Sequence, residues 1–251
     1  MASSSIVVQV GQCGNQVGSA FLQTMREHGD RGGVFRGDVA RAVLVDTEPK
    51  AVDRAVLAAQ RTSRAVAGGT AGAAAGGGGT SSSRGGGGPA PPWRYDRRAV
   101  VRARNEGGAA NNWAYGYAGY GPATAARAVD AVRREAERCD RLDAFLLVHS
   151  AAGGTGSGLG TFLTEELRDR FPAVTVCNAL VCPYRAGEVI VQDYNCMFAL
   201  AHLMDCSDAV LMFENERAGA VCSRQLNLER PTIADLNGVI CGQLVAAALP
   251  S

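Results

Sequence analysis

The chain has 251 residues, 47% hydrophobic and 20% charged, which is long enough for a domain with a sizeable core and typical of a globular protein. Its formal net charge of +1 gives no whole-chain attraction for nucleic acid or for an anionic membrane, so neither is expected as a partner. Lys50 is the only lysine, and Ala51 and Val52 follow it, which excludes the Gly-Lys-Ser/Thr end of a Walker-type phosphate loop.

The eight cysteines predict neither a zinc site nor a secreted protein. No two of them form a Cys-x-x-Cys pair and only three histidines are present, so the usual ligand spacing for zinc is missing. The start Met-Ala-Ser-Ser-Ser lacks the regions of a signal peptide, and no apolar run reaches the roughly 18 residues of a membrane span. We therefore expect a protein of the reducing cytoplasm.

Short apolar, β-branched runs alternate with helical patterns along the chain. The alternation predicts right-handed crossovers and a Rossmann-like α/β fold, with a mostly parallel sheet and helices on both faces. Ligands of such sheets bind at the carboxyl ends of the strands. Strands are predicted at Ile6–Val10, Ala42–Asp46, Ala99–Arg102 (the weakest), Ala144–His149, Val174–Val181 and Ala209–Phe213. Helical spacing is found for Val129, Val132 and Ala136, for Leu159, Phe162, Leu163 and Leu167, and for Ile233, Leu236, Ile240, Leu244 and Ala247.

Residues 65–92 interrupt this pattern. They hold eleven of the 32 glycines, together with Ser, Ala and Pro and almost nothing that a core could bury. Such a composition predicts a disordered surface insertion. The arginines that follow it, Arg94 to Arg104, fit a solvated loop with its adjoining edge strand better than a surface for an acidic partner.

The strongest functional motif is the run Ala152–Gly158 (Ala-Gly-Gly-Thr-Gly-Ser-Gly), between a predicted strand and the helix that begins near Leu159. Glycine amides and the positive end of a helix dipole favour phosphate, and Thr155 and Ser157 add hydroxyl donors. A flexible linker is the alternative interpretation, but the flanking strand and helix favour phosphate binding. The spacing fits neither the Gly-x-Gly-x-x-Gly dinucleotide fingerprint nor the Gly-x-Ser-x-Gly nucleophile elbow.

Three further segments place polar groups at the same predicted edge of the sheet. Gly11–Gln16 (Gly-Gln-Cys-Gly-Asn-Gln) follows the first strand and opens a helix. Asp46 and Glu48 follow the second strand, where two carboxylates suit Mg²⁺, although such residues also commonly cap helices. Gly107–Trp113 supplies amides and an amide side chain.

Together these segments resemble the tubulin family. The motifs Gly11–Gln16, Asn111–Ala114 (Asn-Asn-Trp-Ala), Gly153–Gly158 and Asn227–Thr232 (Asn-Leu-Glu-Arg-Pro-Thr) stand in tubulin order, which is far more specific than any one motif. Ala152, the run Gly187–Gln192 before Tyr194-Asn195, and the run Gly107–Tyr117 are most similar to delta-tubulin.

The resemblance implies a site for GTP or GDP with Mg²⁺ and assigns no catalytic residue. In this site Gln12 and Cys13 lie by the α- and β-phosphates, and the amides of 153–157 cradle the β- and γ-phosphates. Ala109, Ala110 and Asn111 sense the γ-phosphate, and Asn215 and Asn237 read guanine. The implied nucleotide-binding residues are Gly11, Gln12, Cys13, Ala109, Ala110, Asn111, Ala152, Gly153, Gly154, Thr155, Gly156, Ser157, Glu188, Gln192, Asn215, Ile233 and Asn237, with Asp46 and Glu48 holding Mg²⁺ through water.

Three positions depart from the family pattern. Ile233 stands where an aromatic ring stacks on the base, Gln192 replaces an acid that contacts ribose, and Ala152 adds a methyl group to a crowded loop. Glu188, near the ribose in the same loop as Gln192, partly compensates. A neutral hydrogen bond is weaker than a charged one. We therefore predict a functional site with weakened nucleotide affinity.

By the same resemblance, residues 1–251 correspond to the first of three family domains, and the intermediate and carboxyl-terminal domains are absent. Also missing is the loop whose acidic residue completes GTP hydrolysis on an adjoining subunit, so hydrolysis is left open. The implied function is that of a GTP-binding, delta-like structural constituent of the microtubule cytoskeleton. Its implied partners are other tubulins, head to tail, in centrioles, basal bodies and cilia. Two alternatives remain, a dinucleotide-binding oxidoreductase and a non-functional truncated fragment.

Overall fold

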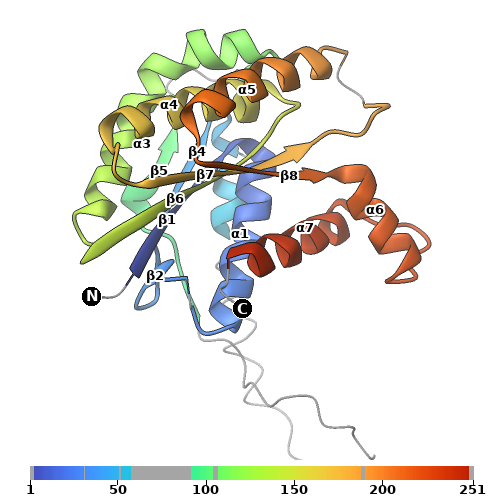
Figure 1. The fold of residues 1–251 in the computed structure, drawn as a ribbon, viewed down its shortest axis with the longest axis horizontal. Helices are drawn as coiled ribbons and strands as arrows, with labels where there is room; N and C mark the ends of the chain where they lie inside the picture. Colours follow the sequence, from blue (N-terminus) through green and yellow to red (C-terminus); the bar gives the residue numbers. More distant parts are fainter. Residues whose placement is uncertain are drawn as a thin grey trace, which may run out of the picture.

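The computed structural model describes residues 3–30, 32–50, 52–57, 92–103, 107–187 and 190–248. At its centre lies a six-stranded sheet (Figure 1). All of the predicted strands are confirmed, including the weakest, with ends that differ by a few residues. The strands are β1 (Ser3–Val10), β4 (Ala42–Asp46), β5 (Val100–Arg102), β6 (Arg141–Ser150), β7 (Thr175–Cys182) and β8 (Ala209–Glu214).

The strand order places one pair of strand ends at a topological switch point. The order is β5-β4-β1-β6-β7-β8, and every neighbouring pair is parallel. This is the doubly wound order of Rossmann-type folds, which confirms the predicted fold class. The chain moves outward in one direction from β1 to β5 and in the other from β6 to β8, so the order reverses between β1 and β6. The rule for open α/β sheets places a ligand at the carboxyl ends of these two strands.

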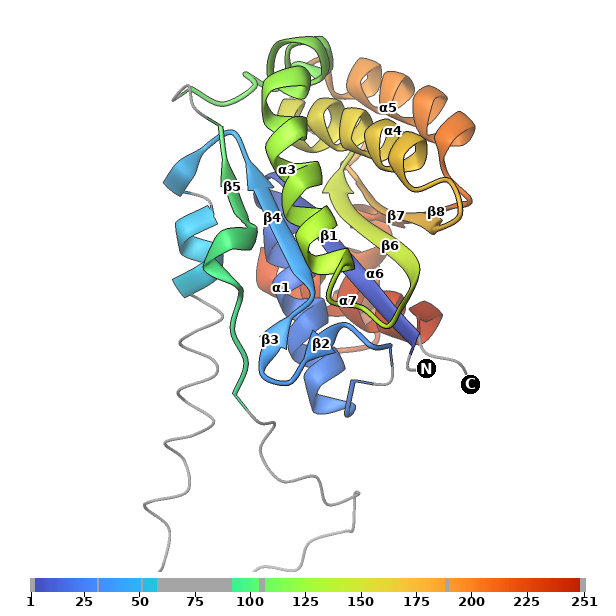
Figure 2. The same ribbon diagram turned by 90° about the vertical axis from the view of Figure 1, so that its left-hand side faces the viewer.

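Helices cover both faces of the sheet (Figures 1 and 2). One face carries α1 (Gly11–Glu27), α6 (Asn215–Arg224) and α7 (Ile233–Ala248), and the other carries α3 (Gly121–Ala136), α4 (Gly160–Arg170) and α5 (Gln192–Cys206). Residues 52–57 are also helical. The short elements are the hairpin β2 (Phe35–Arg36) and β3 (Val39–Ala40), the 3₁₀ turn η1 (Arg97–Ala99), and the π-helical turns η2 (Tyr115–Tyr120) and η3 (Thr155–Leu159).

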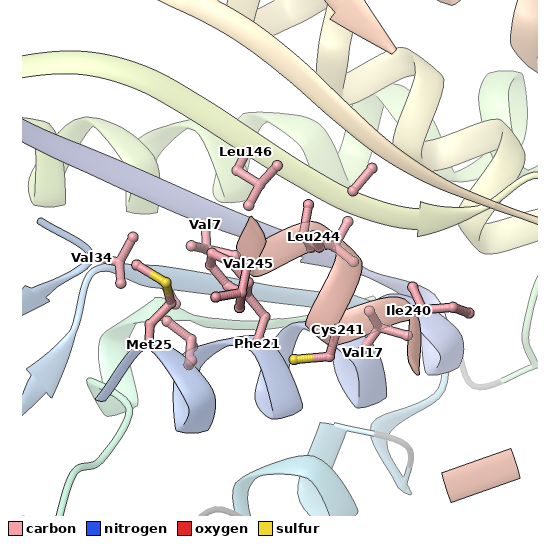
Figure 3. Close-up of a cluster of buried hydrophobic side chains, with 14 of the residues drawn as sticks. Val7, Val17, Phe21, Met25, Val34, Leu146, Ile240, Cys241, Leu244 and Val245 are labelled. Carbon is pink, nitrogen blue, oxygen red and sulfur yellow. The ribbon is translucent and has the colours of Figure 1, made fainter. Parts of the chain in front are cut away.

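Two layers of apolar side chains hold the helices to the sheet. Because strand residues point alternately to opposite faces, Val7 of β1 faces α1 and α7, whereas Ile6 and Val8 face α3 and α4. Phe21 of α1 and Leu244 of α7 belong to the buried cluster on the first of these faces (Figure 3). Both side chains are almost completely buried, and this packing fixes where α1 begins relative to β1.

Two sequence predictions lie outside the described residues. They are the insertion at 65–92, apart from Pro92, and Glu188. In the part of the chain that the structure describes, no helix is both long and apolar enough to cross a membrane. All eight cysteines are free.

Candidate functional site

A cavity of about 750 Å³ lies at the switch point, where β1, β4, β6 and β7 end. Its wall is formed by segments that are far apart in the sequence, as the four polar motifs predicted. Among the predicted site residues, the cavity wall includes Gly11, Gln12, Cys13, Asp46, Glu48, Ala109, Ala110, Asn111, Ala152, Gly153, Gly154, Thr155, Gly156, Gln192, Asn215, Ile233 and Asn237.

Ser157 is the one predicted residue in the described ranges that does not line the cavity. It is completely buried, and its amide donates to the carbonyl of Gly153 at 3.1 Å. Its hydroxyl donates to the same carbonyl oxygen. Both donors of Ser157 are therefore used within the helical turn, and the residues of this loop that line the cavity are those before it. Glu188 cannot be placed, because it lies outside the described residues.

The start of α1 forms one wall of the cavity. The helix begins at Gly11, directly after β1, and no side chain caps it. Gly11 has φ +75°, and a Cβ atom there would lie 3.2 Å from the amide nitrogen of Gly156. The first turn of α1 therefore lies against the loop that follows β6. The first amides of a helix have no partner within the helix, so this turn offers hydrogen-bond donors to an anion.

A second helix start faces the same space. The loop after β6 leads into η3 and α4, again without a side-chain cap and without an acidic residue in the first turn of η3. The hydroxyl of Thr155 lies 2.6 Å from the hydroxyl of Thr47, which is fully buried at the end of β4. This bond ties the predicted phosphate loop, which follows β6, to the end of β4 on the far side of β1. The Thr155 hydroxyl, which we expected as a donor to a ligand, is thus already paired with Thr47.

Glycine lets two backbone segments of the site touch. A Cβ atom on Gly154 would lie 2.5 Å from the carbonyl oxygen of Ala109 and 2.6 Å from the amide nitrogen of Asn112. A Cβ atom on Gly158 would lie 2.2 Å from the carbonyl oxygen of Trp113. Real Cβ atoms do not approach backbone so closely, so the loop after β6 packs on residues 109–113 only because these positions are glycines.

The segment that leads to η2 is conformationally strained. Ala110 and Asn111 have φ values of +46° and +52°, in the left-handed region that residues other than glycine seldom adopt. The turn is closed by the amide of Asn112, which donates to the carbonyl of Ala109 at 2.9 Å. Such strain persists only where the surroundings hold it, and it concentrates at ligand sites and switch regions.

Two carboxylates lie at the cavity edge after β4. Asp46 accepts from the amide of Glu48 at 3.1 Å and from the side chain of Asn15 at 3.3 Å. Burial, together with the nearby charge of Glu48, raises the pKa of Asp46 to about 6. The donor to Asp46 is the amide nitrogen of Asn15, and the side-chain oxygen of Asn15 is buried without a partner.

These residues fit a hard cation. Oxygen ligands are what Mg²⁺ prefers, and it commonly keeps several waters and binds through one or two protein carboxylates. A cation near Asp46 and Glu48 would offset both causes of the raised pKa. Among the described residues no group of three or more His, Cys, Asp or Glu is placed to hold a metal, so the protein itself would supply only part of the coordination shell.

The starts of α6 and α7 also line the cavity. Asn215 is the first residue of α6 and Ile233 the first of α7. The Ile233 side chain is 71% exposed, which is unusual for a large aliphatic residue. Asn237 donates to the side chain of Gln16 at 3.4 Å. Two carboxamides and an apolar side chain therefore face the cavity here, groups that can recognise a flat polar ring.

Residues of the β7–α5 connection complete the wall. Gln192 is buried and donates to the carbonyl of Tyr184 at 2.8 Å, which leaves its carbonyl oxygen as the polar group not used in that bond. Tyr184 and Gln16 also line the cavity, although neither was predicted as a site residue. Gln16 lies within the Gly11–Gln16 motif, so that motif could have identified it as a site residue. No motif in the sequence identifies Tyr184.

Comparison with known proteins shows what the chain is similar to. Residues 94–223, just over half of the chain, match the Tubulin/FtsZ family, GTPase domain. The chain is 34% identical to the tubulin delta chain of Homo sapiens and 33% identical to that of Mus musculus, alignments that each cover 99% of this chain and 53% of the relative. It is also 34% identical to the tubulin beta-1 chain of Colletotrichum graminicola, over 94% of this chain and 51% of that protein. The chain thus spans about half the length of the relatives it matches.

Proposed function

The chain belongs to the Tubulin/FtsZ family, and we propose from this premise that its cavity binds a guanine nucleotide, GTP or GDP. The observation that carries the proposal is the convergence of Gly11–Cys13, Ala109–Asn111 and Ala152–Gly156 on one cavity at the switch point. All three offer backbone amides. No lysine or arginine is among the described residues that line the cavity, so amides and a cation would hold the phosphates.

The two helix starts divide the phosphates between them. The first turn of α1, with Gln12 and Cys13, would contact the α- and β-phosphates. The amides of 153–156, with Ala152 before them, would hold the β- and γ-phosphates. Ser157 was expected from sequence to join them. Its amide is already bonded to the carbonyl of Gly153, so it would stabilise this loop and not contact the phosphates. Ala109, Ala110 and Asn111 would then lie by the γ-phosphate.

Asp46 and Glu48 would hold Mg²⁺ through water. When bound, the cation neutralises phosphate charge. Thr47, between the two carboxylates, is hydrogen-bonded to Thr155, and a Cβ atom on Gly108 would lie 2.7 Å from a carboxylate oxygen of Glu48, which supports their position on the phosphate side.

The base and ribose would occupy the end formed by α6, α7 and the β7–α5 connection. Asn215 and Asn237 can both donate to and accept from the edge of guanine. Ile233 would pack on the base without the additional stabilisation that stacked rings provide. Gln192, with Glu188 from the same connection, would contact the ribose. We propose weakened affinity because Ile233 is aliphatic where the family has an aromatic ring, and Gln192 is neutral where the family has an acid.

At the level of the whole protein, we propose a delta-like structural constituent of the microtubule cytoskeleton. The support is the similarity to proteins named tubulin delta chain, and to a tubulin beta-1 chain. The proposed partners are other tubulins in head-to-tail contact, in the cytoskeleton of the cytoplasm and at centrioles, basal bodies and cilia. The domain assignment, a tubulin-type GTP-binding domain across residues 1–251, is part of the same proposal. Cosedimentation with polymers of other tubulins tests this level.

The nucleotide proposal is tested by titrating the chain with a fluorescent GTP analogue, with and without Mg²⁺, and by competition with GDP, ATP and NAD. Saturable, Mg²⁺-dependent binding that GTP and GDP displace and the others do not is the expected result. Ile233→Tyr should tighten binding severalfold, because an aromatic ring on the base adds about 0.5–1.5 kcal/mol.

The matched control is Leu226→Tyr. Leu226 is also more than half exposed but lies beyond the end of α6 and outside the cavity wall, so its substitution should leave the affinity unchanged. Binding that does not saturate, or displacement by NAD as effective as displacement by GTP, would refute the proposed function.

A further inference from the structure

We propose that Asn195, in the first turns of α5, is a positioning residue that joins the two segments beside the terminal phosphate and links their arrangement to α5. The inference rests on the proposed nucleotide function and deepens it, because it identifies the element that would respond to that phosphate. Asn195 does not line the cavity and is 3% exposed, so it would act through other residues.

The side chain of Asn195 uses both of its donors and its acceptor on three backbone groups. Its amide nitrogen donates to the carbonyl of Ala152 at 2.7 Å and to that of Asn111 at 2.8 Å. Its oxygen accepts from the amide of Trp113 at 2.9 Å. Exchanging the oxygen and nitrogen positions would place an oxygen against two carbonyl oxygens, so the hydrogen bonds determine this orientation.

The bonds join the two segments at the points where each needs support. Ala152 leads into the predicted phosphate loop, and Asn111 is the second of two consecutive residues with positive φ. A strained turn relaxes unless its surroundings hold it. Asn195 holds this turn by the carbonyl of Asn111, while the close packing of Gly154 restrains it at Ala109.

The same contacts tie the strained turn to α5. Gln192, one turn before Asn195, lines the cavity from the start of that helix. The ring of Trp113 packs against Phe198 at 5.3 Å and His202 at 5.0 Å between centroids, about one and two turns after Asn195. A shift of residues 109–111 would therefore act on α5 through a buried side-chain amide and through an aromatic contact.

The test compares Asn195→Ala with Asn178→Ala in the full chain. Asn178 is similarly buried and hydrogen-bonded to His149, Thr164 and Ser207, and none of these bonds reaches either segment. Hydrogen exchange of the nucleotide-free protein should speed up at 109–113 and 152–154 in Asn195→Ala and stay unchanged there in Asn178→Ala. Asn195→Ser provides the same comparison if the alanine variant does not fold.

The second measurement is the ratio of the affinities for GTPγS and GDP. Because the loosened turn faces only the terminal phosphate, Asn195→Ala should lower this ratio about tenfold, whereas Asn178→Ala should not change it. Equal loss for both nucleotides, or unchanged exchange at 109–113, would overturn the inference. If the wild type binds neither nucleotide, the proposed function fails, and the exchange measurement still decides whether Asn195 holds the two segments.

Discussion

Replacing Gly154 by alanine tests the backbone contact on which the site is built. The new methyl group would lie 2.5 Å from the carbonyl oxygen of Ala109, whereas ordinary contact begins near 3.4 Å, so one segment must move by about 0.9 Å. The two nearest atoms are both backbone atoms, so no flexible side chain can move aside to make room for the methyl group. Overpacking of this kind costs about 1–3 kcal/mol, and we expect a loss of about 3 kcal/mol because neither neighbour can turn away.

Gly153→Ala is the matched control one residue earlier. Its methyl group would lie 3.8 Å from the nearest heavy atom, the side-chain oxygen of Asn111, which is ordinary contact. The φ angle of Gly153 is outside the left-handed region, so alanine should change the stability by about 1 kcal/mol or less, in the stabilising direction. Urea unfolding of the nucleotide-free chain, followed by circular dichroism, measures both variants. Equal midpoints for the two variants would refute the reasoning.

Three further predictions concern buried groups. Burial lowers the pKa of His149 from its ordinary 6.5, so below that pH the unfolded chain binds a proton that the folded chain does not. Unfolding measured from about pH 7.5 down to about pH 5.5 should therefore show the wild type losing up to about 1.4 kcal/mol more than His149→Gln, and parallel curves would contradict this. Thr47→Val should cost about 1 kcal/mol by removing the hydroxyl paired with Thr155, and Thr47→Ser should retain most of the stability in the same unfolding assay. Leu244→Ala, in the core between α1 and the sheet, should cost about 2–5 kcal/mol by calorimetry or urea unfolding, whereas alanine at the exposed neighbour Gln243 should change stability by less than about 0.5 kcal/mol.

The sheet could be predicted from sequence because its strands are buried on both faces. Runs such as 42–46 and 144–149 are almost continuously apolar, a pattern that a parallel strand between two helical layers requires. Helix α5 has no such clear pattern. It exposes Tyr194, Met197 and Met204 while burying Ala199 and Leu203, so apolar residues lie on both faces and no stripe identifies it. The strands β2 and β3, two residues each, are too short for any periodicity.

The candidate site also has features that local sequence motifs predict and others that depend on the fold. The segments that surround the cavity follow from motifs, because glycines between a strand and a helix identify a loop at the carboxyl edge. Which groups within a segment face the cavity depends on the turn that forms. Ser157 illustrates this, since its amide donates to the carbonyl of Gly153 within the turn that opens η3. The bonds of Thr47 to Thr155 and of Asn195 to Asn111 join residues 108 and 84 positions apart, and only the fold brings them together.

The absence of lysine and arginine from the described cavity wall has a consequence for charge balance. A nucleotide entering without a cation would bring several negative charges close to the carboxylates of Asp46 and Glu48, with only neutral amides to receive them. Repulsion between like charges at short distance is costly, so the complex should form with the metal-loaded nucleotide and discriminate against the free anion. Affinity would then follow the concentration of the divalent cation closely and that of monovalent salt only weakly, unlike a phosphate site built on arginines.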